Sequence, residues 1–184
     1  MLAVRSLDAH IESDGVSNFA EGILRLAIFL AYIFLIGQFK DIKRVFAYHG
    51  AEHMTVHAYE HGLDLETKNV RQFPTAHNRC GTAFLLTVMM VAIVVFTFVG
   101  RPSIVVSIAS RVVLVPIIAG ISYEIIRISG FYNNNPLVKL IAYPSLALQS
   151  LTTRQPDDQQ IEVAIAAMNK AIDVDKENKE ARKS

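Results

Sequence analysis

The sequence has little of what stabilises small secreted domains or attracts nucleic acid. It contains one cysteine in 184 residues, Cys80, so an internal disulfide framework is excluded. Its formal net charge of +1 excludes the strongly basic field of a nucleic-acid-binding domain, and we expect no nucleic-acid partner. Charged residues make up only 19% of the chain and hydrophobic residues 52%, which excludes a wholly disordered protein. The composition is therefore more apolar than that of an ordinary soluble domain.

Long runs with little or no charge define the class of this protein. Three such runs occupy residues 22–38, 80–100 and 103–129. A helix that crosses a bilayer needs about 20 predominantly apolar residues, and each run approaches or exceeds that length. We therefore expect an all-α, polytopic membrane protein in contact with the lipid bilayer. Its transmembrane helices are predicted near residues 19–37, 81–99 and 104–126.

Basic residues near the ends of these runs predict the orientation in the membrane. Lys40, Lys43 and Arg44 follow the first run, whereas only Arg5 precedes it. Because basic residues accumulate in cytoplasmic loops, we expect the loop over residues 38–80 and the C-terminal part in the cytoplasm or an equivalent compartment, with the N-terminus outside. The first 18 residues lack the basic-then-apolar order of a signal sequence, so the first run is expected to remain as an uncleaved anchor.

The chain is expected to divide into four parts. They are a tail over residues 1–18, a membrane domain over 19–129 with a cytoplasmic histidine-rich helix and loop over 39–80, an interfacial segment and C-terminal helix over 130–173, and a charged tail over 174–184. Pro136 and Pro144 make residues 130–152 too broken for a spanning helix, so we expect an interfacial or re-entrant segment there. The charged tail is expected to fray.

A C-terminal amphipathic helix is expected from Pro156, because a proline followed by Asp157 and Asp158 matches the preferences of a helix start. Its apolar residues recur at spacings of 4, 3 and 4, and they are Ile161, Ile165, Met168 and Ile172. A stripe this narrow suits one partner helix or a membrane surface. We therefore expect this helix to dock.

The strongest chemical signal is a pair of His-x-x-Glu-His motifs. The first comprises His49, Glu52 and His53, and the second begins eight residues later at His57. Residues i and i+4 of a helix project from adjacent turns about 40° apart, so His49 and His53 can share one Zn²⁺ ion. Glu52 can then act on a metal-bound water as general base, as in the inverted zinc-protease motif. The second copy ends beside Gly62, where the helix is expected to stop, so the first copy is preferred. The alternative is a polar helix face that holds no metal.

A zinc ion on His49 and His53 needs a third protein ligand. Glu124 is the leading choice, because a carboxylate within a membrane-spanning segment is costly and points to a function. His77 is the second choice. For Glu124 the alternative is an ion pair with a nearby arginine such as Arg127.

Several blocks of sequence stand in a characteristic order and spacing. They are Tyr48–His53, His77–Thr82, Ala119–Glu124 and Leu151–Asp158. Together they resemble the YqhQ-like family of bacterial and plastid membrane proteins, over roughly residues 20–168. The resemblance implies an integral protein of a bacterial plasma membrane or a plastid membrane, with a predicted metal dependence and no settled substrate. The family's motif carries over to His49, Glu52, His53, His77, Arg79, Cys80 and Glu124, whereas Met54 and Asn78 depart from it. Longer members begin with a glycine-rich segment that this chain is expected to lack, which leaves a reduced, non-catalytic form open.

Three functions from different classes remain open at this point. The first is a metal-dependent enzyme, expected to be a hydrolase, with a divalent metal, zinc foremost, at the cytoplasmic face. The second is a non-catalytic structural or assembly subunit of a larger membrane complex, joined to other subunits or to copies of itself. The third is a metal-binding sensor or carrier. An enzyme requires an open coordination position on the metal and a glutamate outside the ligand set.

Overall fold

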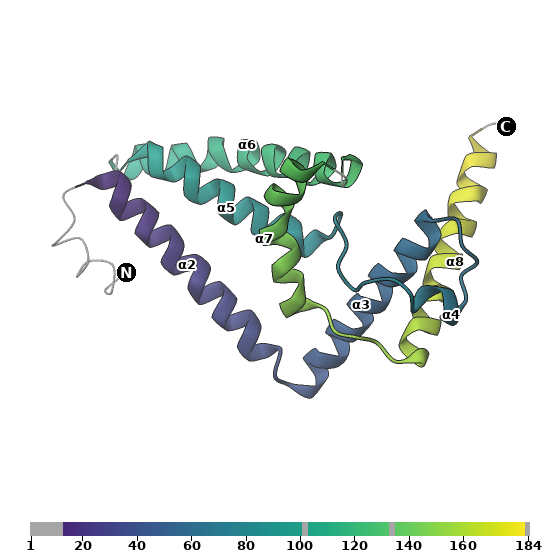
Figure 1. Ribbon diagram of the computed structural model, residues 1–184. Helices are drawn as coiled ribbons and strands as arrows, with labels where there is room; N and C mark the ends of the chain where they lie inside the picture. The colour runs from purple at the N-terminus through teal and green to yellow at the C-terminus, as the bar shows by residue number, and fades with distance from the viewer. Residues whose placement is uncertain (1–12, 101–102, 133–134, 183–184) are drawn as a thin grey trace. The chain divides into compact units, whose positions relative to one another are not determined.

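The computed structural model describes residues 13–100, 103–132 and 135–182, and within them the chain is helical with no strand (Figure 1). Its helices are α2 (Asp14–Ile36), α3 (Lys40–Glu60), α4 (Thr67–Val70), α5 (Gly81–Val99), α6 (Ile104–Phe131), α7 (Pro136–Thr152) and α8 (Asp158–Ala181). The expected all-α class is confirmed. The chain divides into two compact units. The membrane unit comprises Met1–Phe34 and Asn78–Ser145, and the histidine unit comprises Leu35–His77 and Leu146–Ser184.

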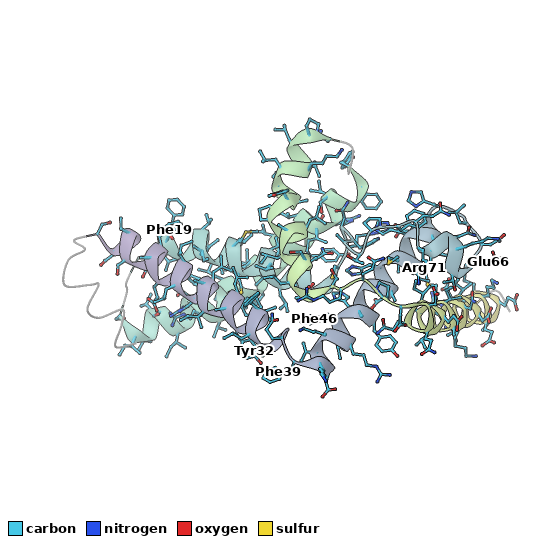
Figure 2. The ribbon with its side chains drawn as sticks, turned by 60° about the horizontal axis from the view of Figure 1, so that its bottom comes forward. Phe19, Tyr32, Phe39, Phe46, Glu66 and Arg71 are labelled. Atoms are coloured by element: carbon cyan, nitrogen blue, oxygen red, sulfur yellow. The ribbon has the colours of Figure 1, made fainter. Side chains whose placement is uncertain are left out.

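Three helices of the membrane unit are long and apolar enough to cross a bilayer. They are α2 with 23 residues, α5 with 19 and α6 with 28. Few of their apolar side chains are buried, as expected for a surface that faces lipid; Phe19 and Tyr32 on α2 are exposed examples (Figure 2). The three predicted transmembrane helices are thus present. Two of them extend beyond the predicted bounds, because α2 begins at Asp14 and α6 continues to Phe131.

Small and polar side chains fix the packing of the membrane unit. The Asn18 side-chain amide donates hydrogen bonds to the carbonyl oxygens of Phe96 and Gly100, at 3.1 and 2.7 Å. A Cβ atom at Gly22 would lie 2.8 Å from Cγ1 of Ile93, so only glycine permits this approach of α2 to α5. Such small residues let helix backbones come close in a membrane, where the hydrophobic effect gives helices no reason to associate.

The histidine unit is built on a small core between α3, α4 and α8. Its fully buried side chains are Ala51, Met54 and Ala58 of α3, Val70 of α4 and Ile161 of α8. Ile165 packs against this core, and Met168 and Ile172 are half-buried. The amphipathic stripe of the C-terminal helix is therefore its docking face, as its spacing predicts.

Two segments of the C-terminal third are more regular than the sequence suggests, although α7 is not among the candidate membrane spans. Residues 136–152 form one continuous helix, α7, although Pro144 lies inside it. An internal proline removes one backbone hydrogen bond, and packing offsets that loss here: the hydroxyls of Thr87 and Ser145, beside Pro144, lie 3.0 Å apart in the buried interior. Helix α8 likewise continues to Ala181, through most of the tail that was expected to fray. Its charges alternate in sign, and Lys179 lies 2.6 Å from Asp175 one turn earlier.

Candidate metal centre

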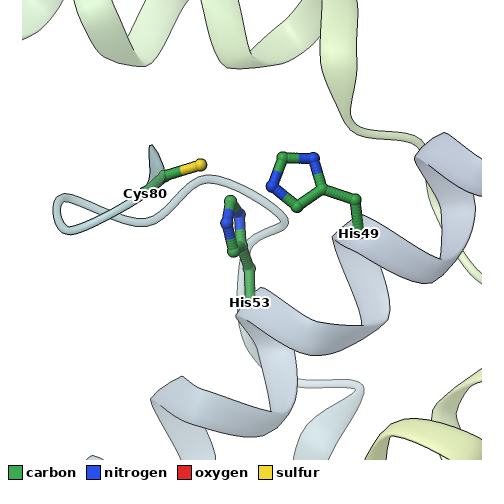
Figure 3. A group of neighbouring side chains, drawn as sticks. All are labelled: His49, His53 and Cys80. Carbon is green, nitrogen blue, oxygen red and sulfur yellow. The ribbon is translucent and has the colours of Figure 1, made fainter. Parts of the chain in front are cut away.

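Helix α3 carries histidines on three successive turns of one face. His49, His53 and His57 are spaced by four residues, which keeps them nearly in line along the helix. The rings of His49 and His53 lie edge to face with their centroids 4.3 Å apart, and Figure 3 shows both rings rising from α3. The predicted juxtaposition of the two imidazoles is confirmed as geometry.

Each of these rings is oriented by a backbone carbonyl. Nδ1 of His49 lies 2.8 Å from the carbonyl oxygen of Thr152, and Nδ1 of His53 lies 2.7 Å from that of Thr75. Nε2 of His57 lies 2.9 Å from the carbonyl oxygen of Ala76. A carbonyl can only accept, so the nitrogen that faces it carries the proton in the neutral ring. The lone pair is then on Nε2 of His49 and His53 and on Nδ1 of His57. Metal-binding histidines are typically oriented by the same kind of second hydrogen bond.

Close backbone contact brings the carbonyls to α3. The chain between α7 and α8 crosses α3 at Gly50, where a Cβ atom would overlap the carbonyl oxygen of Arg154. The backbone N–H of Arg154 donates to the carbonyl of Phe46 at 2.9 Å. Glycine at position 50 is therefore required for the approach that places the Thr152 carbonyl beside His49.

His77 joins the cluster from the loop that follows α4. Gln149 of α7, only 1% exposed, holds the backbone of His77 in both directions. Its side-chain oxygen accepts from the His77 N–H and its amide donates to the His77 carbonyl, each at 2.8 Å. The His77 ring centroid lies 5.7 Å from that of His53 and 4.6 Å from that of His57. His77 is thus the predicted ligand that the fold brings to the α3 histidines.

His57, Glu60 and His77 form a group of three donors in the histidine unit. One ligand atom from each lies within 4.8 Å of the other two, and Nε2 of His77 is 3.3 Å from Oε2 of Glu60. Burial lowers the pKa of His77; the neighbouring His57 and His53 lower it further, whereas Glu60 opposes the shift. The ring is therefore neutral at neutral pH, which is the form that ligates a metal.

The remaining predicted site residues are described each in its own unit. Glu52 is on α3 and is exposed. Glu124 belongs to the membrane unit, where Nη1 of Arg127 lies 3.3 Å from both of its carboxylate oxygens. The ion pair considered as the alternative for Glu124 is therefore present. Cys80 also belongs to the membrane unit, as the buried N-cap residue of α5, with its Sγ 3.0 Å from the Thr82 hydroxyl oxygen.

The second motif copy, ranked below the first in the sequence-based prediction, also contributes side chains to the group of donors. That copy supplies His57 and Glu60 to the cluster, whereas its last residue, His61, is exposed at the C-cap of α3. Nδ1 of His61 lies 2.8 Å from the His57 carbonyl of the same helix. The sequence does indicate the place of His57. It follows His53 by four residues and so continues the line of histidines on one face of the helix.

The fold and the cluster define a class: a helical, polytopic membrane protein with a histidine-rich unit outside its apolar helices. The chain matches the model of a family described as protein of unknown function (DUF1385), over residues 2–174. It is 38% identical over 152 residues to the uncharacterized protein YqhQ of Bacillus subtilis (strain 168). The chain therefore belongs to this family, and the resemblance drawn from its motifs is confirmed.

That alignment covers 83% of this chain and 48% of YqhQ, so the chain spans about half the length of the relative it matches. No solved structure matches the chain significantly.

Proposed function

We propose that this protein is an integral membrane protein that binds a divalent metal ion, zinc foremost, in its histidine unit, and that the ion supports a hydrolytic reaction. The observation that carries the proposal is that His57, Glu60 and His77 bring three ligand atoms within 4.8 Å of one another. The α3 histidines beside them are oriented by backbone carbonyls, as metal-binding histidines typically are. Basic residues after the first transmembrane helix favour a cytoplasmic position for this unit.

Two ligand sets within the histidine unit are candidates, and His77 belongs to both. The first joins His49 and His53 to His77, whose ring centroid is 5.7 Å from that of His53, and it follows from the motif on which the sequence-based prediction rests. The second joins His57 and Glu60 to His77. Each set offers three ligands, which is the number found in catalytic zinc sites that keep a fourth position for water.

In the hydrolytic reaction, the metal would polarise a bound water and lower its pKa. Glu52 lies between His49 and His53 on α3, is exposed to solvent, and is our candidate for the general base that takes the proton.

The test is metal analysis of the full-length protein, purified in mild detergent without chelator and loaded with zinc. Wild-type protein is expected to retain stoichiometric zinc, and His77→Ala is expected to lose it under either ligand set. Loss in His49→Ala but not in His57→Ala identifies the first set, and the converse identifies the second.

His61→Ala is the matched control, because it removes an exposed imidazole from the same helix. Glu52→Gln should keep the metal and lose turnover. Wild-type protein that binds no stoichiometric metal would refute the proposal.

A specific observation also favours the non-catalytic alternative. The same histidines bond to carbonyls of separate segments, at Thr75, Ala76 and Thr152, and so hold the histidine unit together without any ion. Absence of metal from the wild-type protein would make a structural or assembly subunit of a larger membrane complex the leading function.

A further inference from the structure

A cavity of about 220 Å³ lies in the membrane unit, where α2 begins, α5 ends and α6 begins (Figure 1). It follows α5 from Met89, near the middle of that helix, to Gly100, which comes directly after its last residue. Ala92, Ile93 and Phe96 make this wall apolar. The cavity therefore covers the depth from the middle of the α5 span to its end.

Three charged side chains line the same cavity from the other two helices. They are Glu21 and Arg25 of α2 and Arg111 of α6. Glu21 and Arg25, one turn apart on α2, form an ion pair with each other. Arg111 makes no hydrogen bond or ion pair with any residue in the described parts of the chain. The cavity thus contains one positive charge that no acidic group of those parts balances.

The position of Arg111 makes this charge costly in a membrane. It comes seven residues after Ile104, the first residue of α6, or about 10 Å along the helix axis at 1.5 Å per residue. Its side chain is exposed, although α6 is apolar enough to cross a bilayer. A charge within a membrane-spanning helix usually pairs with another group or marks a binding site. An anion in the cavity would supply the missing partner of Arg111.

Polar side chains make the cavity a formed site for such an anion. Ser107 lines it four residues before Arg111, and residues four apart share one face of a helix. The serine hydroxyl and the guanidinium group can therefore donate to one ligand. Across the cavity, the Asn18 amide donates to the carbonyls of Phe96 and Gly100 at 3.1 and 2.7 Å, which fixes the start of α2 against the end of α5.

The chemistry of these walls indicates the ligand. A guanidinium group matches the paired oxygens of a carboxylate or a phosphate, and one unbalanced positive charge is complementary to a head with one negative charge. The apolar wall, which runs towards the middle of the membrane, suits a hydrocarbon chain.

We propose that this cavity binds the head of a membrane amphiphile with a single negative charge. Arg111 takes that charge, and the first part of the chain lies along Ile93 and Met89. The carboxylate of a fatty acid and the phosphodiester of a phospholipid share this chemistry. The proposal does not depend on metal binding by the histidine unit, and either one can fail without the other.

The test measures binding of oleate and of phosphatidylglycerol to the full-length protein in detergent, each against neutral phosphatidylcholine. Native mass spectrometry and ligand-dependent shifts in melting temperature give the two readouts. Wild-type protein is expected to prefer an anionic amphiphile, and the tighter of the two identifies a carboxylate or a phosphodiester as the head. Arg111→Gln should weaken its binding about fivefold, the effect of removing one arginine near a membrane surface. Ala92→Leu should weaken it too, because the larger side chain fills the cavity without changing any charge.

Arg127→Gln is the matched control, because it makes the same change on the same helix at an arginine that pairs with Glu124 and does not line this cavity. Equal losses in Arg111→Gln and Arg127→Gln would refute the site, as would the absence of any preference over phosphatidylcholine. Arg111→Lys keeps the charge and should retain most of the preference, which separates loss of binding from loss of folding.

Two further arms examine the alternatives. Glu21→Gln releases Arg25 and should strengthen binding of the anion; weaker binding would show that Glu21 is the partner of Arg111, and the proposal would be overturned. Acetate and inorganic phosphate serve as chain-free probes. If either protects at millimolar concentration as well as the amphiphile does, the cavity is a site for free anions and the amphiphile proposal is wrong.

Discussion

His77 is the residue in which burial and chemistry are most closely linked. The residue is 7% exposed, its ring lies beside two other imidazoles, and Glu60 is its acidic neighbour. Burial favours the neutral ring and lowers the pKa of His77 below the ordinary value of 6.5. A neutral ring can ligate a metal at neutral pH, whereas a protonated ring cannot.

The lowered pKa predicts how stability depends on pH. In the unfolded chain His77 takes up a proton near pH 6.5, while in the folded chain it does so only at lower pH. Between these two values the unfolded state binds more protons, so the contribution of His77 to stability is complete above about pH 6.5 and is lost as the pH falls through that window. The metal-free protein should therefore melt at a lower temperature as the pH falls from about 7 towards 5.

The measurement is a series of thermal unfolding curves against pH, after chelator treatment. His77→Gln should flatten the dependence, because it removes the group that titrates. His61→Gln is the control, since it changes an exposed histidine at the end of the same cluster. A slope that persists unchanged in His77→Gln would show that another group is responsible.

At the scale of single elements, the start of α8 illustrates how local sequence determines structure. Asp157 is the N-cap, and its side chain accepts from the Gln160 N–H at 2.8 Å. The Gln160 side chain in turn accepts from the Asp157 N–H at 2.9 Å, which completes a capping box. Ile161 follows directly and is fully buried in the core of the histidine unit. The cap therefore fixes the residue at which the docking face begins.

Replacing Asp157 by alanine should destabilise the histidine unit by about 1 kcal/mol, the usual contribution of an N-cap side chain. Chemical unfolding monitored by circular dichroism would measure the loss. Gln159→Ala provides the comparison, because this neighbour is exposed and lies outside the capping box. If both variants lose the same stability, the cap has no special role.

Elements with a regular pattern could be predicted from the sequence, whereas those that depend on tertiary contacts could not. Runs with little or no charge predicted α2, α5 and α6, and the 4-3-4 spacing predicted the docking of α8. The continuity of α7 was not predictable, because the penalty of Pro144 is local while the contact of Ser145 with Thr87 is distant in sequence. The candidate site shows the same division. Helical spacing predicted the pairing of His49 with His53, but the carbonyls that orient the rings come from loops whose course depends on the whole unit.

At the scale of the whole molecule, the number of membrane crossings determines which parts can share a compartment. If α2 crosses once, the start of α2 and the histidine-rich loop after it lie on opposite faces. If α5 and α6 then cross in opposite directions, the chain returns to the face of that loop. This topology predicts that residues 37–80 and the described residues after α6 share one side, which is required if segments of both contribute to the histidine unit.

The positions of the basic residues predict that this side is the cytoplasm. The test uses the full-length chain with Cys80→Ser, which removes its one cysteine. Single cysteines are then introduced by Ser13→Cys, before α2, and by Asp64→Cys, in the loop after α3; both positions are exposed. In intact cells a membrane-impermeant maleimide should label the first variant and leave the second unlabelled until the membrane is permeabilised. The reverse pattern would place the histidine unit outside the cell. A metal site there would draw on external rather than cytoplasmic metal, so the orientation determines which pool of ions and substrates the protein can meet.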